Sequence, residues 1–109
     1  MKTIEKRIRN IIEIVLIQSK ITLKDIIIFG SRARGDFKEG SDFDILIIIK
    51  NDINIDQKRS LWKEVYHALH KDFPLIPFDV IIKTVKDFED EKDVVNTISN
   101  EACIEGIKI

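Results

Sequence analysis

The chain has 109 residues, 44% of them hydrophobic and 34% charged, which excludes a disordered chain and predicts one folded domain over residues 1–109. Its formal net charge of −1 shows no basic surplus, so direct nucleic-acid binding is not expected. The sequence has a lone cysteine, and its charged N-terminus is unlike a signal peptide. No apolar run approaches the roughly 18 residues that span a membrane. These features predict a cytoplasmic protein without a membrane segment.

The first half of the chain predicts a helix and two strands joined by a polar loop. Apolar residues recur at helical spacing from Thr3 to about Ser19, with Thr3 as the N-cap. The β-branched stretch from Asp25 to Phe29 is typical of a short buried strand, and residues 31–35 form a helical turn. The stretch from Phe43 to Lys50 is apolar on both faces, which predicts a second strand that is covered on both sides.

The second half predicts a helix, a strand and a final helix. Helical periodicity returns from about Asp56 to Asp72 and is broken by the prolines that follow. The segment "FDVIIK", residues 78–83, is a third strand, and about Asp87 to Glu105 forms one last helix. The inward side chains expected on that helix are Val94, Val95, Ile98, Ala102 and Cys103. This order of elements makes the fold class α+β, a small mixed sheet flanked by helices.

Three aspartates, Asp42, Asp44 and Asp79, stand where the second and third strands begin. Residues i and i+2 of a strand point to one face, so Asp42 and Asp44 project together, and Asp79 joins them if the two strands are neighbours. Clustered carboxylates repel one another unless a cation lies between them, and an all-oxygen set suits Mg²⁺ better than Zn²⁺. The alternative is a polar turn that runs into a strand without any chemistry.

The segment "FGSRARG" follows the first strand directly. Gly30 allows a sharp turn, and Ser31 then stands at a helix N-terminus, where free N–H groups and a hydroxyl can hold phosphate oxygens. Arg32 and Arg34 add positive charge within reach. Taken alone, the segment is more typical of a capped turn with solvated arginines. Followed by a pair of aspartates, it indicates metal-dependent nucleotide chemistry.

The pattern G-S-x10-D-x-D with a later strand aspartate resembles the nucleotidyltransferase superfamily that includes DNA polymerase beta, and more closely its smallest members, the MNT (minimal nucleotidyltransferase) domain proteins. The resemblance covers nearly the whole chain. By this resemblance, Gly30 and Ser31 match the phosphate-binding pair, and Asp42 and Asp44 match two metal-binding carboxylates. Asp79 matches the third carboxylate, the expected base. The resemblance implies a small mixed sheet backed by helices, ATP as the substrate and two Mg²⁺ ions.

The resemblance also implies a partner. MNT proteins typically act as antitoxins in two-gene toxin–antitoxin modules, here of type VII, and silence a HEPN-domain toxin by transferring AMP from ATP to a tyrosine hydroxyl. Because the motif occupies most of the chain, we expect another molecule to supply the acceptor. Two alternatives stay open: a non-catalytic nucleotide-binding antitoxin that masks its toxin by contact, and a small-molecule nucleotidyltransferase.

Four side chains of the predicted middle helix are assigned to structure and surface. His67 and His70 lack a third ligand in the sequence, so they are interpreted as surface residues. Trp62 and Tyr66 stand four residues apart, a spacing more typical of packing on a helix than of a base-stacking platform, and an exposed partner surface is the alternative.

Overall fold

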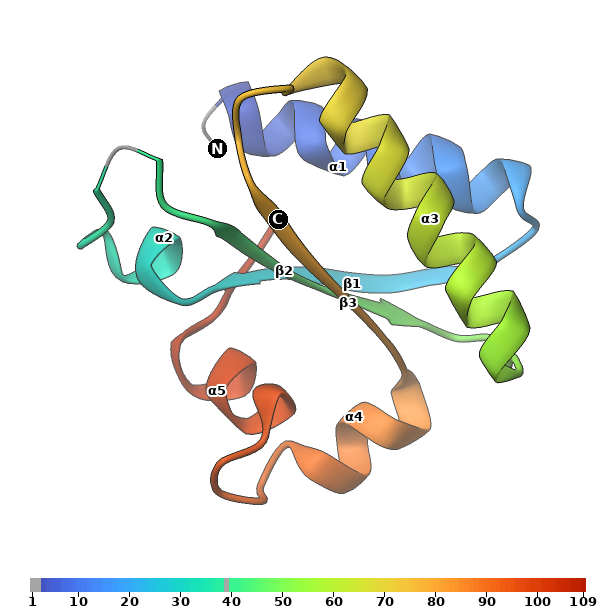
Figure 1. Ribbon diagram of the computed structural model, residues 1–109. Coiled ribbons are helices and arrows are strands. Elements are labelled where there is room, and N and C mark those ends of the chain that lie inside the picture. Colours follow the sequence, from blue (N-terminus) through green and yellow to red (C-terminus); the bar gives the residue numbers. More distant parts are fainter. Residues whose placement is uncertain (1–2, 39) are drawn as a thin grey trace.

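The computed structural model describes residues 3–38 and 40–109, and it confirms the predicted mixed fold of a sheet flanked by helices (Figure 1). In chain order the elements are α1 (Thr3–Gln18), β1 (Leu23–Phe29), α2 (Ser31–Arg34), β2 (Phe43–Ile49), α3 (Ile55–Asp72), β3 (Phe78–Thr84), α4 (Val85–Glu91), α5 (Ile98–Glu105) and β4 (Ile107–Lys108). Within the described residues, no helix is long and apolar enough to cross a membrane.

The sheet has the strand order β3-β2-β1-β4. β1 and β2 are antiparallel neighbours, whereas β2 and β3 are parallel because α3 carries the chain back between them. Both β2 and β3 therefore begin at the same edge of the sheet. β4 pairs antiparallel with β1 and is not predicted from the sequence, since a two-residue strand shows no periodicity.

Helices cover both faces of the sheet, as the doubly apolar second strand predicts. In Figure 1, α1 and α3 lie on one face, and α4 and α5 lie on the other. Ile45 and Ile47 of β2 belong to the core under α1 and α3, while Leu46 and Ile48 belong to a second core with Ala102 of α5. Because successive side chains of a strand point to opposite faces, the even-numbered positions of β2 face α4 and α5.

The prediction of one last helix from Asp87 to Glu105 is wrong, because the chain forms two short helices there. Between α4 and α5 the backbone turns, with Asn96 in the left-handed region at φ +71°. The Thr97 side chain then caps α5 by accepting a hydrogen bond from the Asn100 N–H. A threonine that caps a new helix outweighs the helical spacing that runs through this segment.

The split helix also leaves exposed several side chains that were expected to face inward. Val94 and Val95 are 52% and 75% exposed, and Cys103 is exposed as well. Ile98 is 40% exposed, and of the five predicted positions only Ala102 is buried. The physical reason is that α5 meets the sheet through the small side chains of Ser99 and Ala102 rather than through a wide apolar stripe.

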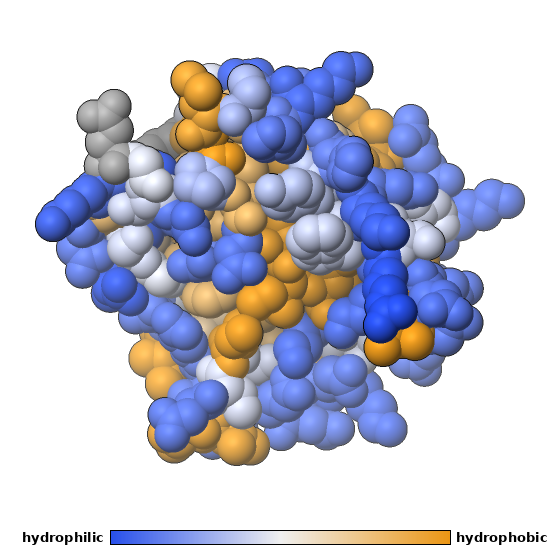
Figure 2. Space-filling model, viewed as in Figure 1, coloured by the Kyte–Doolittle hydropathy of each residue, from blue (hydrophilic) through white to orange (hydrophobic). Residues whose placement is uncertain are grey.

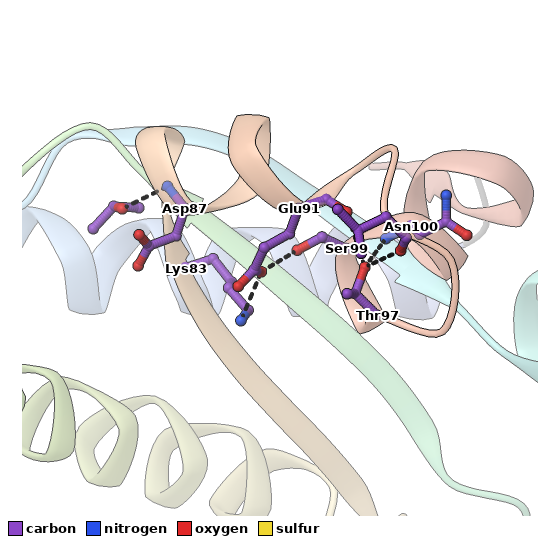
Figure 3. A network of polar contacts seen from close by, with 8 residues as sticks. Lys83, Asp87, Glu91, Thr97, Ser99 and Asn100 are labelled. Carbon is purple, nitrogen blue, oxygen red and sulfur yellow. Dashed lines mark hydrogen bonds and ion pairs between the residues drawn. The ribbon is translucent and has the colours of Figure 1, made fainter.

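A polar network holds α4, α5 and β3 together (Figure 3). The Glu91 carboxylate accepts hydrogen bonds from Ser99 Oγ and Lys83 Nζ, each at 2.9 Å. The Thr97 hydroxyl donates to the main-chain oxygen of Glu91, also at 2.9 Å. Ser99 is completely buried, so its hydroxyl needs this acceptor. The orientation of α5 is thus set by directed polar contacts.

Trp62 and Tyr66 pack as predicted. Their rings stack with centroids 5.0 Å apart, and Trp62 Nε1 donates to the main-chain oxygen of Val80 at 2.8 Å. His67 and His70 are exposed, which confirms the surface interpretation.

Candidate active site

The structure brings the three predicted aspartates to one edge of the sheet. Asp44 of β2 and Asp79 of β3 are register partners on neighbouring parallel strands. Asp44 lies on the same face as Leu46, and Asp79 on the same face as Ile81, so both carboxylates face the layer of α4 and α5. Asp42 stands two residues before Asp44, at the entry to β2. The condition under which Asp79 joins Asp42 and Asp44, that the third strand lies beside the second, is therefore met.

The surroundings of Asp44 disfavour the charged form of its carboxyl group. Its pKa is raised from 3.8 to about 6, first by burial and then by the negative charges of Asp79 and Asp42. Glu101 of α5 adds a smaller effect of the same sign, and the Arg34 guanidinium opposes it. The side chains that surround Asp44 thus supply too little positive charge to balance it.

This donor set fits a hard divalent cation. All the groups that converge are carboxylates, which are the ligands preferred by Mg²⁺. Within residues 3–38 and 40–109, no three acidic, histidine or cysteine side chains are already placed to hold a metal ion. Asp42 and Asp79 both repel the charge of Asp44, and a cation between the three carboxylates would remove that repulsion.

The glycine-serine turn lies directly against Asp44. Gly30 adopts φ +73°, and a Cβ atom at this position would be 2.2 Å from Asp44 Oδ2. Only glycine leaves room for the carboxylate there. Ser31 follows as the first, half-buried residue of α2. The predicted phosphate-binding turn and the predicted metal-binding carboxylate are therefore in contact.

Arg34 lies on the aspartate side of the sheet. Its Nη1 atom pairs with Glu105 Oε1 at 2.9 Å, and its Nε atom pairs with Asp36 Oδ2 at 3.3 Å. The hydrogen bond to Asp36, followed by the charges of Asp36 and Glu105, raises the pKa of Arg34. Arg34 is also the cation that lowers the pKa of Asp44. Both of its pairs are with carboxylates of this chain, and a phosphate-binding role for it stays a prediction.

Arg32 lies elsewhere. Its guanidinium stacks on the rings of Phe37 and Phe43, 4.3 Å and 4.4 Å from their centroids, and donates to the main-chain oxygen of Ser41 at 3.0 Å. Phe43 belongs to the core under α1 and α3, on the face of the sheet opposite to Asp44. Arg32 therefore braces the loop that leads to Asp42, and a phosphate-binding role for it stays a prediction.

Sequence reasoning missed Glu101 and Glu105 of α5. The fold carries Glu101 within electrostatic reach of Asp44, and Glu105 pairs with Arg34. Burial, followed by a hydrogen bond to the accepting Glu105 carboxylate and by the charge of Glu105, raises the pKa of Glu101. The signal in the sequence is a pair of like charges four residues apart on a helix, an unfavourable spacing without a nearby cation.

A small mixed sheet with a glycine-serine turn against strand carboxylates defines a nucleotide-transfer class of protein, and comparison with known families agrees. Residues 8–104 match the family described as Nucleotidyltransferase domain. The chain belongs to this family and is a nucleotidyltransferase.

Two curated relatives come from Methanocaldococcus jannaschii. The protein named "Putative protein adenylyltransferase MJ0604" is 31% identical over 86 residues, which cover 79% of this chain and 75% of that protein. The protein named "Putative protein adenylyltransferase MJ0141" is 37% identical over 68 residues, which cover 62% of this chain and 68% of that protein.

A solved structure shares the fold. It is a crystal structure of a toxin–antitoxin with AMP-PNP, and one of its chains superimposes with a TM-score of 0.59 at 17% identity. The match covers 91% of this chain and 69% of the other.

Proposed function

We propose that the chain transfers AMP from ATP to a hydroxyl group of a partner protein, in a reaction that requires Mg²⁺. The observation that carries this proposal is the contact between the glycine-serine turn and Asp44, which itself lies beside Asp79 in the sheet. A turn that can hold phosphates and carboxylates that can hold cations thus meet at one point.

Each side chain has a proposed role. Asp42, Asp44 and Asp79 would hold two Mg²⁺ ions, which when bound neutralise the triphosphate and stabilise the leaving pyrophosphate. The Ser31 hydroxyl and the loop N–H groups would bind the terminal phosphates, and Arg34 would balance their charge.

The bond changes follow from this arrangement. The acceptor oxygen forms a new bond to the α-phosphorus while the bond from that phosphorus to the bridging oxygen of the β-phosphate breaks. Pyrophosphate leaves, and the proton of the acceptor hydroxyl passes to the Asp79 carboxylate, which acts as general base. The products are the AMP ester of the acceptor and pyrophosphate.

The acceptor is proposed to be a tyrosine hydroxyl of a HEPN-domain toxin, with this chain as a single-domain, cytoplasmic antitoxin of a type VII module. Two findings support the choice of a protein acceptor. The curated relatives carry the name protein adenylyltransferase, and a toxin–antitoxin with AMP-PNP contains the same fold.

The test is a transfer reaction. The purified chain is incubated with ATP labelled at the α-phosphate, MgCl₂ and a HEPN-domain protein identified among the proteins encoded by the neighbouring genes. We expect label on a tyrosine of that protein and none after the double substitution Asp42→Asn/Asp44→Asn. Asp25→Asn is the matched control, because Asp25 lies in β1 and pairs with Lys108 at 3.6 Å.

Two outcomes would replace the proposal by its alternatives. If the double variant still neutralises the toxin at wild-type potency without any AMP adduct, the chain masks its partner by contact. If label accumulates only on small hydroxyl compounds, the acceptor is not a protein.

A further inference from the structure

A hollow on the outer side of α5 is lined by apolar side chains that the fold leaves uncovered. Val95, Ile98 and Ile104 line it together with Glu101 and Glu105. Val95 is 75% exposed and Ile104 is 77% exposed. In Figure 2, hydrophobic side chains show at the surface where α5 lies in Figure 1, at the lower left of the view. Clustered exposed apolar side chains that are rimmed by polar ones typically mark interaction surfaces.

The helix that carries this surface is held in a fixed orientation. Ser99 and Ala102 are its only buried residues within the described part of the chain, and Ser99 is anchored to Glu91. Thr97 ties the start of the helix to the main chain of α4. The apolar side chains of α5 therefore contribute little to the core. Because the helix that carries them is already fixed, little conformational entropy is lost when a partner binds to them.

The hollow lies near the candidate active site. Glu105 lines the hollow and pairs with Arg34 at 2.9 Å. Glu101 lines the hollow as well, and its charge reaches Asp44. A molecule seated against α5 would therefore lie next to the carboxylates at which AMP transfer is proposed.

The charges in the hollow decide which molecule fits. Glu101 and Glu105 line the hollow, and Arg34, which also pairs with Asp36, cannot balance all of these carboxylates, so a net negative charge remains that disfavours a nucleotide, a nucleic acid or an anionic membrane as the occupant. The same carboxylates attract lysine or arginine, and the aliphatic side chains suit apolar ones. On this charge complementarity, and resting on the proposed function, we infer that the hollow docks the acceptor protein through a segment that carries apolar and basic residues.

The experiment compares two isoleucines of nearly equal exposure. Ile104→Ser removes an apolar group from the hollow, whereas Ile17→Ser makes the same change on α1, in the opposite helix layer, where Ile17 is 73% exposed. Val95→Ser is the second hollow variant. The affinity for the same HEPN-domain protein, AMP transfer to it and the affinity for ATP with Mg²⁺ are each measured.

We expect Ile104→Ser to weaken the complex about tenfold, as loss of one well-packed apolar anchor typically does, and Val95→Ser to act in the same direction. Ile17→Ser should stay within about twofold of wild type, and ATP affinity should be unchanged in all three variants. Raising the salt concentration should weaken the wild-type complex several-fold, because charged pairs at the rim are screened.

Several results would overturn the inference. The first is that the Ile104 and Ile17 variants bind the partner with equal affinity. The second is a complex whose affinity does not change with salt concentration, and the third is that the wild-type chain forms no complex. A loss of ATP affinity in Ile104→Ser would assign the hollow to the nucleotide instead. The proposed function fails separately: a complex that depends on Ile104 but transfers no AMP refutes the reaction and leaves the docking surface standing.

Discussion

Two groups of carboxylates on the same side of the sheet have opposite electrostatic surroundings. Glu91 receives hydrogen bonds from Lys83 and Ser99, which lower its pKa. Burial and the negative charges of Asp79 and Asp42 raise the pKa of Asp44 to about 6. The first carboxylate is satisfied by the fold and holds the fold together. The second is left unsatisfied, and strongly perturbed groups of this kind gather at functional sites.

The sharpest way to test this contrast is to remove the unsatisfied charge. We expect Asp44→Asn or Asp79→Asn to lower AMP transfer by roughly 10²–10⁴-fold, because each removes an anionic cation ligand or the general base. Neither variant should be less stable than wild type, since the charges they delete repel one another. Initial rates with saturating ATP and the midpoint of thermal unfolding are the measurements.

The control for that prediction is Glu91→Gln, which removes a charge from the satisfied group. It should cost stability and leave AMP transfer within a few-fold of wild type. If Asp44→Asn keeps wild-type transfer, or unfolds the chain while Glu91→Gln does not, the two groups have been assigned the wrong way round.

A smaller effect is expected from the turn that touches Asp44. Gly30→Ala would place a Cβ atom 2.2 Å from Asp44 Oδ2, so the carboxylate or the turn must move. Gly35→Ala is a matched control, because Gly35 also has a positive φ, +82°, but no heavy atom lies within 4 Å of its added Cβ. Gly35→Ala should lose about 1–2 kcal/mol of stability from strain in the left-handed region, and Gly30→Ala should lose more, because at ψ −155° its backbone lies in a region essentially restricted to glycine.

Only Gly30→Ala should also lower AMP transfer, by about 10- to 100-fold, since displacements of about 1 Å in a reacting group cost this much. Steady-state rates of both variants and urea unfolding separate strain from displacement. Equal activities of the two variants would show that the contact between the turn and Asp44 has no catalytic consequence.

How far the sequence predicts this arrangement depends on the range of the interactions. The strand that carries Asp44 and the turn at Gly30 follow from local pattern, since apolar runs, glycine and residue spacing are read along the chain. The neighbouring position of Asp79 follows once β2 and β3 are parallel. The approach of Glu101 and Glu105 could not be predicted, because it depends on the turn after α4 and on contacts between distant segments.

The exposed side chains of α5 show the same limit in another form. Spacing predicts that Val95 and Ile98 are apolar positions of a helix and therefore inward. Burial, however, is decided by what the helix packs against, and α5 packs through Ser99 and Ala102. A pattern of apolar residues thus identifies a hydrophobic helix face, but it does not show whether this chain or another protein covers that face.

The satisfied group can be tested by itself on α4. Glu91→Gln weakens the pair with Lys83 and the acceptor for the buried Ser99 hydroxyl, so we expect a loss of about 1 kcal/mol of stability. Glu89→Gln is the matched control: Glu89 pairs with Lys92 at 2.7 Å, but the pair lies at the surface and should contribute little. Thermal unfolding compares them, and equal midpoints would show that the network does not hold α5.

The smallest expected effect is on the pH dependence of stability without Mg²⁺. The pKa of Asp44 is about 6 in the folded chain and 3.8 in its ordinary state, so between pH 4 and 6 the folded state binds more protons than the unfolded state. The contribution of Asp44 to stability is therefore present below about pH 4 and is lost as the pH rises through 6. Asp44→Asn should be more stable than wild type at pH 7.5, by on the order of 1 kcal/mol after solvent screening of this half-exposed group.

That difference should shrink as the pH falls toward 4, where the wild-type carboxyl also becomes neutral. Urea unfolding in EDTA at several pH values measures it, and added Mg²⁺ should stabilise the wild type above pH 6 more than Asp44→Asn, because the variant lacks one of the three proposed carboxylate ligands. A difference between the two proteins that is constant from pH 4 to 7.5 would mean that Asp44 is balanced by its own fold as Glu91 is, and the contrast between the two carboxylate groups would no longer point to the reaction.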